Sequence, residues 1–228
     1  YIAPKTVVEE CARLGIHCTY LGTGCIFTYD DAAGADAAHP CPSDEWEVRD
    51  RERDGVDDDE VATFAGSGYS AVKGLLDRDL GGLLGGCLVL RLRMPISDGA
   101  EGRNFITKIA GYERICSVQN SMSDLPSLLP LMVAMIEAGE VGRYNFTNPG
   151  AISHNEVLAL YRAICDPGFS WNNWTEAEQS LVLAAGRSNT TLKTGKLQAV
   201  AAKLGVELPP IDVAIQRSLV EYAQRGVT

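Results

Sequence analysis

The segment Cys87–Leu92, Cys-Leu-Val-Leu-Arg-Leu, restricts the fold more than any other part of the sequence. It is a nearly continuous apolar run that follows two glycine pairs, so it predicts a strand without a polar face. Such strands are covered by helices on both faces of a parallel sheet. Helical spacing occurs before it, from Val7 to Gly15 and from Gly66 to Leu80, and His17–Leu21 reads as a short buried strand. This alternation predicts an α/β fold with a parallel sheet flanked by helices.

Helical pattern dominates the rest of the chain, above all beyond about residue 120. Ser153 and Glu156 have the spacing of a capping box, which predicts that a helix begins there. Periodicity predicts further helices at 104–112, 125–138, 197–204 and 211–223, and short strands at 115–118 and 143–147. We therefore expect a small, mostly helical C-terminal lobe, mixed with returning sheet elements, over residues 121–228.

The negative charge of the chain is concentrated in one segment. Nine Asp and four Glu lie between positions 30 and 60, against Arg49, Arg51 and Arg53, and this excess equals the net charge of −10 of the whole chain. Two prolines and little periodicity predict that residues 30–62 form a solvated acidic loop, an insertion in the domain. The rest of the chain is neutral and has no basic patch, so we expect no nucleic-acid partner.

The sequence gives no sign of a membrane or metal protein. No stretch approaches the roughly 18 consecutive apolar residues of a membrane helix, and no signal peptide is visible. The seven cysteines are odd in number and never spaced as Cys-x-x-Cys. This pattern favours reduced thiols, so we expect a cytoplasmic protein. His17, His39 and His154 are far apart, so we expect no metal site.

Tyr69 and Lys73 form the first candidate for chemistry, because residues four apart share one face of the predicted helix. An ammonium beside a phenol lowers the pKa of the tyrosine, which is otherwise about 10. Tyr69 could then act as general acid toward a carbonyl oxygen that becomes an alkoxide during hydride delivery. Such a pair can also arise by chance, but its position after a strand that ends at Thr23 strengthens the interpretation.

Thr23 and Cys25 lie at the end of that strand, where open α/β sheets bind ligands. Thr23 could hydrogen-bond the same carbonyl, although without the tyrosine and lysine it would read as a turn residue. Cys25 is by default a small buried hydrophobe. Beside a lysine, however, its pKa would fall from about 8.5 and it could exchange protons.

A series of motifs along the chain carries a family resemblance. They are Thr-Gly-Cys-Ile-Phe (23–27), Gly-Ser-Gly-Tyr-Ser-x-x-Lys (66–73), Leu-Arg-Met-Pro-Ile-Ser (92–97), Arg-Asn-Phe-Ile-Thr-Lys-Ile (103–109), Asn-Ser-Met (120–122), Tyr-Asn-Phe-Thr-Asn-Pro-Gly (144–150), Ser-His-Asn-Glu-Val-Leu (153–158) and Arg-Ser-Asn (187–189). Together they resemble the nucleotide-rhamnose synthase epimerase-reductases, also found as the C-terminal half of plant UDP-rhamnose synthases. This family belongs to the extended short-chain dehydrogenase/reductases, alongside bacterial dTDP-4-dehydrorhamnose reductase.

The resemblance implies a Rossmann-like sheet and two reactions on a UDP- or dTDP-linked 4-keto-6-deoxyglucose. These are epimerisation at C3 and C5, followed by reduction at C4 with NADPH, or else NADH. Residues 1–120 would then be the C-terminal part of an NADP-binding domain, and residues 121–228 the substrate-binding lobe. A simple 4-keto reductase and a non-catalytic nucleotide-sugar-binding protein of the same fold remain alternatives. A homodimer is compatible with the resemblance.

The resemblance also implies roles for individual residues. Tyr69, Lys73 and Thr23 would be the reductase set, and Lys73 would also hold the nicotinamide ribose. Cys25 and Lys108 would be the acid/base pair of the epimerase, although Lys108 by itself reads as a solvated helix lysine.

Four further residues take binding roles from the same resemblance. Met94 and Pro95 would contact the nicotinamide side of the cofactor, although Pro95 also reads as a strand terminator. Asn104 and Arg187 would contact the diphosphate of the substrate, Arg187 as a phosphate fork. For Arg187 a surface position is an equally good interpretation.

The sequence departs from the family pattern in one major respect. The family begins with a strand, a Gly-x-x-Gly-x-x-Gly turn and a helix that receives the cofactor pyrophosphate. The glycines of this chain do not have that spacing, so we expect an N-terminally truncated sequence that lacks the Gly-rich βαβ unit. Because an acidic wall would repel a nucleotide diphosphate, we also expect the acidic loop to arch away from the site, so that deletion of about residues 34–56 leaves substrate binding intact.

Overall fold

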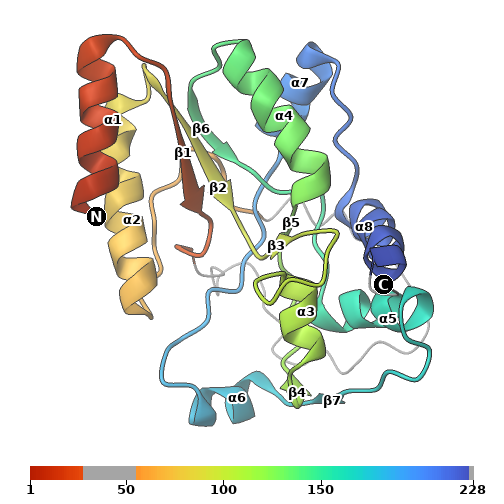
Figure 1. Cartoon of the computed structure of the whole chain (residues 1–228). Helices are drawn as coiled ribbons and strands as arrows, with labels where there is room; N and C mark the ends of the chain where they lie inside the picture. Colours follow the sequence, from red (N-terminus) through yellow and green to blue (C-terminus); the bar gives the residue numbers. More distant parts are fainter. Residues whose placement is uncertain (28–54, 226–228) are drawn as a thin grey trace.

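The computed structural model describes residues 1–27 and 55–225 (Figure 1). The α-helices in this part are α1 (Ile2–Leu14), α2 (Gly68–Leu80), α3 (Phe105–Ala110), α4 (Leu125–Glu137), α5 (His154–Ile164), α6 (Glu176–Val182), α7 (Gly195–Leu204) and α8 (Ile211–Arg225). The strands are β1 (Cys18–Thr23), β2 (Cys87–Leu92), β3 (Pro95–Ile96), β4 (Arg114–Ile115), β5 (Ser123–Asp124), β6 (Gly142–Asn145) and β7 (Asn172–Asn173). A single 3₁₀ turn, η2 (Gly81–Leu83), precedes β2.

The predicted parallel sheet is confirmed. β1, β2 and β6 pair in that order, all parallel, with Cys18 beside Cys87 and Leu88 beside Gly142. β2 lies in the middle, and its first five residues are buried. Its side chains alternate between two apolar clusters. Figure 1 shows that α1 and α2 lie on one side of the sheet and α4 and α7 on the other. Cys87 and Val89 pack with α1 and α2, whereas the leucines between and after them pack with α4 and α7.

The interpretation of the first strand as buried is wrong. β1 runs from Cys18 to Thr23, and Leu21 in its middle is 50% exposed. Within the described residues β1 pairs along one side only, with β2, so it is an edge of the sheet. Apolar residues alone do not distinguish an edge strand from a central one.

Most of the other predicted elements are confirmed, with shifted ends. Gly15 caps α1 in the left-handed conformation at φ 67°, and the predicted capping box of Ser153 and Glu156 begins α5. The strand expected at 115–118 is only the two residues of β4. α6 was not predicted, although Thr175 and Glu178 form a second capping box at its start.

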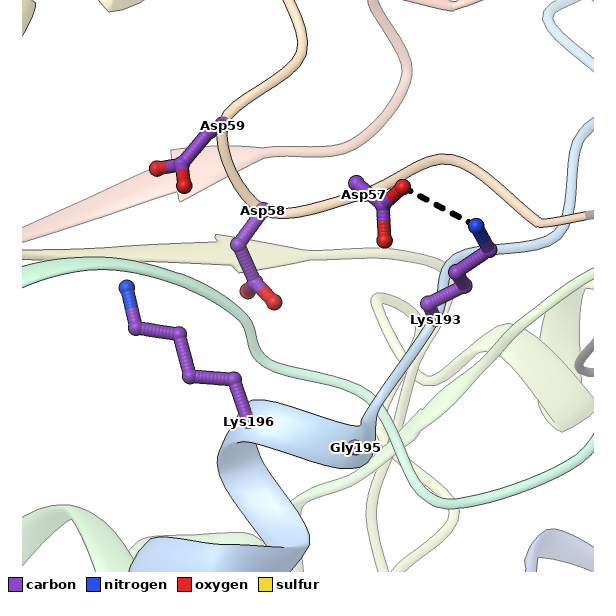
Figure 2. A pocket seen from close by; sticks show the side chains of 6 residues that line it. All are labelled: Asp57, Asp58, Asp59, Lys193, Gly195 and Lys196. Carbon is purple, nitrogen blue, oxygen red and sulfur yellow. Dashed lines mark hydrogen bonds and ion pairs between the residues drawn. The ribbon is translucent and has the colours of Figure 1, made fainter.

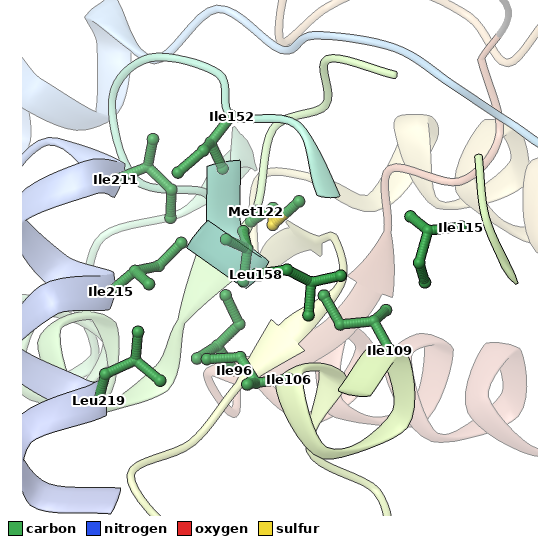
Figure 3. Close-up of a cluster of buried hydrophobic side chains, with 11 residues drawn as sticks. Ile96, Ile106, Ile109, Ile115, Met122, Ile152, Leu158, Ile211, Ile215 and Leu219 are labelled. Carbon is green, nitrogen blue, oxygen red and sulfur yellow. The ribbon is translucent and has the colours of Figure 1, made fainter. Parts of the chain in front are cut away.

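A second apolar core lies beyond the sheet, under α3, α5 and α8 (Figure 3). Its buried side chains are Ile96, Ile106, Ile109, Ile115, Met122, Ile152, Val157, Leu158, Ile211, Ile215 and Leu219. Because four of these residues precede position 120 and seven follow it, one core spans the predicted boundary between the two parts of the chain. The division at residue 120 stays a prediction.

The end of the acidic segment is packed against the sheet, which corrects the expectation of a solvated loop for these residues. Val56 bridges to Leu192, and Asp58 is only 8% exposed. The carboxylate of Asp58 accepts the backbone N–H of Asn145 at 2.5 Å, while burial raises its pKa. Residues 28–54 lie outside the described residues, so the predicted course of the loop over that range is untested.

Charged side chains are buried beneath this segment. Arg91 is fully buried in β2 and donates two hydrogen bonds to the Asp77 carboxylate of α2, at 3.0 and 2.6 Å. It also donates to the carbonyl oxygens of Asp58 and Glu60. Arg143 of β6 donates to the Asp77 carbonyl at 2.6 Å. Arg91 therefore connects α2 and the end of the acidic segment to the middle strand, β2.

No helix in the described ranges combines the length and apolar composition needed to cross a membrane. Six cysteines lie in these ranges, and all are free thiols.

Candidate active site

The turn after β1 carries Thr23 and Cys25. Thr23 is the last residue of the strand and is 9% exposed; its Oγ1 accepts the backbone N–H of Cys25 at 3.1 Å. Because this bond uses a lone pair, the hydroxyl proton can still be donated to a ligand. Gly24 is required by close packing, since a Cβ there would lie 2.6 Å from Leu192 Cδ1 and 2.9 Å from Arg93 Cγ. The turn is therefore packed closely between the side chains of Leu192 and Arg93.

Tyr69 and Lys73 share one face of α2, as the sequence predicts. Ser67 caps this helix by accepting the backbone N–H of Ser70, so Tyr69 lies in the first turn with 57% of its surface exposed. The Lys73 ammonium lies 6.0 Å from the centre of the Tyr69 ring. It also donates to Tyr20 Oη at 3.0 Å, a contact from β1 that the sequence did not reveal.

Met94 and Pro95 follow β2 at the same edge of the sheet. Met94 has a φ of 40°, the one positive value among the described non-glycine residues. Such a conformation is costly for a residue with a side chain and persists where the surroundings enforce it, often at functional sites. Ser123 of β5 holds the backbone of the preceding residue, Arg93. Its hydroxyl oxygen accepts the Arg93 N–H at 3.0 Å, and its backbone N–H donates to the Arg93 carbonyl at 2.8 Å.

Arg187 lies in the segment between α6 and α7 and is exposed. The residues around it are bound to the rest of the edge. Gly186 donates its N–H to the Gly66 carbonyl at 3.0 Å, just before α2, and the Ser188 hydroxyl donates to the Phe27 carbonyl at 2.7 Å. Arg187, the residue predicted to bind the diphosphate, therefore lies in a segment that is bonded to the start of α2, the helix that carries Tyr69.

Asn104 and Lys108 belong to α3, beyond the carboxyl ends of β1 and β2 in Figure 1. Asn104 is 3% exposed and caps this helix, accepting the N–H of Ile106 at 3.1 Å. Its amide donates to the carbonyls of Ser97 and Gly99 at 2.9 and 2.6 Å. A contact from Asn104 to the substrate stays a prediction, and it would require the amide to exchange one of these bonds. Lys108 is exposed.

His154, the first residue of α5, packs against α3 and lies near the charge of Arg187. Its ring lies edge-on to Phe105, with the ring centres 5.3 Å apart. Burial lowers the pKa of His154 to about 4, a hydrogen bond to the Val118 carbonyl opposes this, and the nearby charges of Arg187 and Arg93 lower it further. The imidazole is therefore neutral near neutral pH, and its buried Nδ1 has no hydrogen-bond partner within the described part of the chain. In the sequence, His154 lies in one of the family motifs, and nothing local predicts that it is buried and neutral.

Two hollows elsewhere contain none of the predicted residues. One, of about 400 Å³, lies at the start of α7 and is lined by Asp57, Asp58, Asp59, Lys193, Gly195 and Lys196 (Figure 2). Lys193 pairs with Asp57 at 2.9 Å, and Lys196 donates to the backbone carbonyl of Arg143, so both lysines already have partners. The other, of about 560 Å³, lies between α4 and α8. Among the described residues no group of three or more His, Cys, Asp or Glu side chains could hold a metal ion.

Thr23 and Cys25 lie at the carboxyl end of β1, the edge at which α/β proteins bind ligands. The helix α2, which carries Tyr69 and Lys73, contacts the same strand through the bond from Lys73 to Tyr20. The fold as a whole matches a solved relative. The crystal structure of the UDP-rhamnose synthase L780 of Acanthamoeba polyphaga mimivirus superposes with a TM-score of 0.82 and 38% identity, over 96% of this chain and 69% of that one. The chain belongs to the rhamnose-synthase epimerase/reductase family.

Sequence relatives agree with this membership. L780 itself is 42% identical over 86% of the chain and 63% of its own length. The bifunctional dTDP-4-dehydrorhamnose 3,5-epimerase/reductase of Arabidopsis thaliana is 39% identical over 95% of the chain and 64% of its own length. The chain therefore spans a little under two thirds of these curated relatives. No protein-family model matches it.

A more distant structure shares the fold alone. The dTDP-4-dehydrorhamnose reductase of Bacillus anthracis, solved in complex with NADP, is 17% identical and has a TM-score of 0.65, over 95% of this chain and 70% of that one. The L780 structure and the sequence relatives confirm the family that the motifs suggested, and the solved structures confirm the Rossmann-like fold.

Proposed function

We propose that the protein is a 3,5-epimerase/4-reductase of a nucleotide-linked 4-keto-6-deoxyglucose, dependent on NADPH. The observation that carries this proposal is the fixed turn of Thr23 and Cys25 beside the Tyr69–Lys73 helix, at the carboxyl edge of the sheet, in a chain of this family. One keto group links the two activities, because a carbonyl at C4 acidifies the C–H bonds at C3 and C5 and also accepts hydride.

In the reduction, Tyr69 donates its phenolic proton to the C4 oxygen as the carbonyl becomes an alcohol. Bound NADPH would supply the hydride that adds to C4. Thr23 donates its hydroxyl proton as a hydrogen bond to the same oxygen, with its lone pair held by the Cys25 N–H at 3.1 Å. The positive charge of Lys73, 6.0 Å from the Tyr69 ring, stabilises the phenolate that remains.

In the epimerisation, Cys25 and Lys108 act from opposite faces of the sugar ring. One group removes the proton from the carbon beside the ketone, and the electron pair moves onto the C4 oxygen as an enolate. The other group then returns a proton to the opposite face of that carbon, so its configuration inverts and the ketone is restored. The same exchange serves C3 and C5, and solvent protons enter at both positions.

The residues present fit the nicotinamide end of the cofactor. Lys73 has an ammonium that reaches a hydroxyl at 3.0 Å in Tyr20, and it could bind ribose hydroxyls in the same way. Met94 and Pro95 would lie against the nicotinamide, with the Met94 backbone held at φ 40°. NADPH is the proposed cofactor and NADH is the alternative. A cytoplasmic location and a homodimer are further parts of this proposal.

The substrate would be held by its diphosphate. Arg187 presents a guanidinium, whose planar fork matches phosphate oxygens, on a segment bound to Gly66 and Phe27. Some relatives are UDP-sugar enzymes and others are dTDP-sugar enzymes. The bases of these nucleotides, uracil and thymine, differ by one methyl group. Parallel assays with UDP- and dTDP-4-keto-6-deoxyglucose measure the preference.

The test is the consumption of NADPH with each keto sugar, followed by NMR identification of the product. We expect a nucleotide-linked rhamnose from at least one of them. The variant Cys25→Ala should lose epimerisation, whereas Cys165→Ala, which removes a half-buried thiol of the other core, should retain it. Reduction without epimerisation would favour the simple reductase, and binding of the sugar without NADPH oxidation would overturn the enzyme proposal.

A further inference from the structure

Arg93 lies directly after β2 and is 1% exposed. Its guanidinium binds two separate segments of the candidate site. Nη1 donates to the Gly24 carbonyl at 2.9 Å and to Ser188 Oγ at 3.2 Å. Nη2 donates to the Ser188 carbonyl at 2.7 Å and to Asn120 Oδ1 at 2.5 Å.

Two of these acceptors are sequence neighbours of predicted site residues. Gly24 lies between Thr23 and Cys25, and Ser188 follows Arg187. Asn120 extends the connection, since its Oδ1 also accepts the Thr190 N–H at 3.0 Å. The guanidinium is planar and its donors have fixed directions, so one side chain sets the separation of the segments it binds.

We propose that Arg93 is a positioning residue of the active site. It clamps the Thr23–Cys25 turn against the segment of Arg187 and so sets the distance between the groups that act on the sugar ring and the group that holds its diphosphate. This inference rests on the proposed function for the roles of those groups. The clamp itself is a statement about geometry.

The backbone of Arg93 is fixed as firmly as its side chain. Ser123 binds both its N–H and its carbonyl, and the next residue, Met94, is held at φ 40°. Arg93 therefore also joins the predicted nicotinamide contact to the turn. A shift of the guanidinium would displace the Thr23–Cys25 turn relative to the Arg187 segment, while Ser123 keeps the backbone of Arg93 in place.

Arg91 offers a matched control. It is equally buried two residues earlier, but its guanidinium binds Asp77 and the carbonyls of Asp58 and Glu60. Both Arg91→Lys and Arg93→Lys keep a positive charge and lose a planar fork, so both should lower the melting temperature. Only Arg93→Lys should disturb the catalytic turn.

The first readout needs no catalysis. The alkylation rate of Cys25 by iodoacetamide, followed by peptide mass analysis, should change by at least about fivefold in Arg93→Lys and by less than about twofold in Arg91→Lys. The second readout is the steady-state rate with keto sugar and NADPH. Arg93→Lys should lower kcat by about 100-fold and raise the KM of the nucleotide sugar, because small misplacements of reacting groups are costly.

The two proposals fail in different ways. Equal Cys25 alkylation rates in Arg93→Lys and the unchanged protein would overturn the clamp, whatever the activity. An unchanged protein that neither epimerises nor reduces the keto sugars would overturn the proposed function, while the alkylation rates would still decide the clamp. Equal losses of kcat in Arg91→Lys and Arg93→Lys would overturn the positioning role, because Arg93 would then only stabilise the fold.

Discussion

The carboxylate of Asp77 lies between two buried arginines, and Asp77→Asn tests how much the fold depends on it. The carboxylate accepts Arg91 Nε at 3.0 Å and Nη2 at 2.6 Å, and it lies 3.6 Å from Arg143 Nε. The side chains of Arg91, Asp77 and Arg143 are 0%, 7% and 7% exposed. The substitution keeps the shape and one acceptor oxygen but removes the negative charge between two buried guanidinium groups.

The expected loss is large relative to the stability of a domain. Removing one partner of a buried ion pair costs about 3–5 kcal/mol, because the other charge stays buried without compensation. The remaining acceptor of the asparagine places our expectation at the lower end, about 3 kcal/mol. Total stabilities are about 5–15 kcal/mol, so this is a substantial fraction. With an m value of about 2 kcal/mol per molar, the urea midpoint should fall by about 1.5 M.

Asp79→Asn is the matched control, on the same helix two residues later. Asp79 accepts from Lys5 at 3.1 Å near the surface, where ion pairs contribute little. Its urea midpoint should stay close to that of the unchanged protein. A midpoint of Asp77→Asn equal to that of Asp79→Asn would refute the reasoning that the two arginines depend on this carboxylate.

Two further substitutions test packing and protonation. In Gly24→Ala the new Cβ would lie 2.6 Å from Leu192 Cδ1 and 2.9 Å from Arg93 Cγ, so thermal denaturation should show that the free energy of unfolding falls by about 1–3 kcal/mol. The control is Gly195→Ala, whose Cβ meets open space at the start of α7 and should leave the free energy of unfolding unchanged. Equal effects of the two substitutions would contradict the close packing at Gly24. The neutral state of His154 stabilises the fold fully above its unfolded pKa of about 6.5, and this contribution is lost as pH falls toward the folded pKa of about 4. Between about pH 7 and pH 4 the unchanged protein should therefore lose about 3 kcal/mol more in urea titrations than His154→Gln, and parallel losses would contradict it.

The sheet could be predicted because its signals are local. The apolar run of β2, the glycine that ends α1 and the capping box of α5 each lie within a few residues. The edge position of β1 could not be predicted, since burial depends on which strands pair with it. The second capping box, at Thr175 and Glu178, is also a local signal, and it marks the start of α6.

The candidate site was predictable in its motifs but not in its connections. The Lys73–Tyr20 bond joins residues 53 positions apart, and the Ser188–Phe27 bond spans 161 positions. Arg93 stands in the sequence as one charge after an apolar strand, and nothing local predicts its acceptors. The capping role of Asn104, by contrast, follows from asparagine before a helix, a signal that the family resemblance overshadowed.

In the proposed enzyme, one site performs proton exchange and reduction with different residues. The most direct test of this division is solvent-deuterium incorporation at C3 and C5 of the keto sugar by Tyr69→Phe, with NADPH oxidation recorded in the same reaction. Tyr112→Phe, at a comparably exposed tyrosine after α3, is the control and should retain both activities. We predict that Tyr69→Phe exchanges deuterium at both carbons at close to the unchanged rate while NADPH oxidation falls by about 100-fold or more. Equal losses of exchange and reduction in Tyr69→Phe would contradict the division of roles.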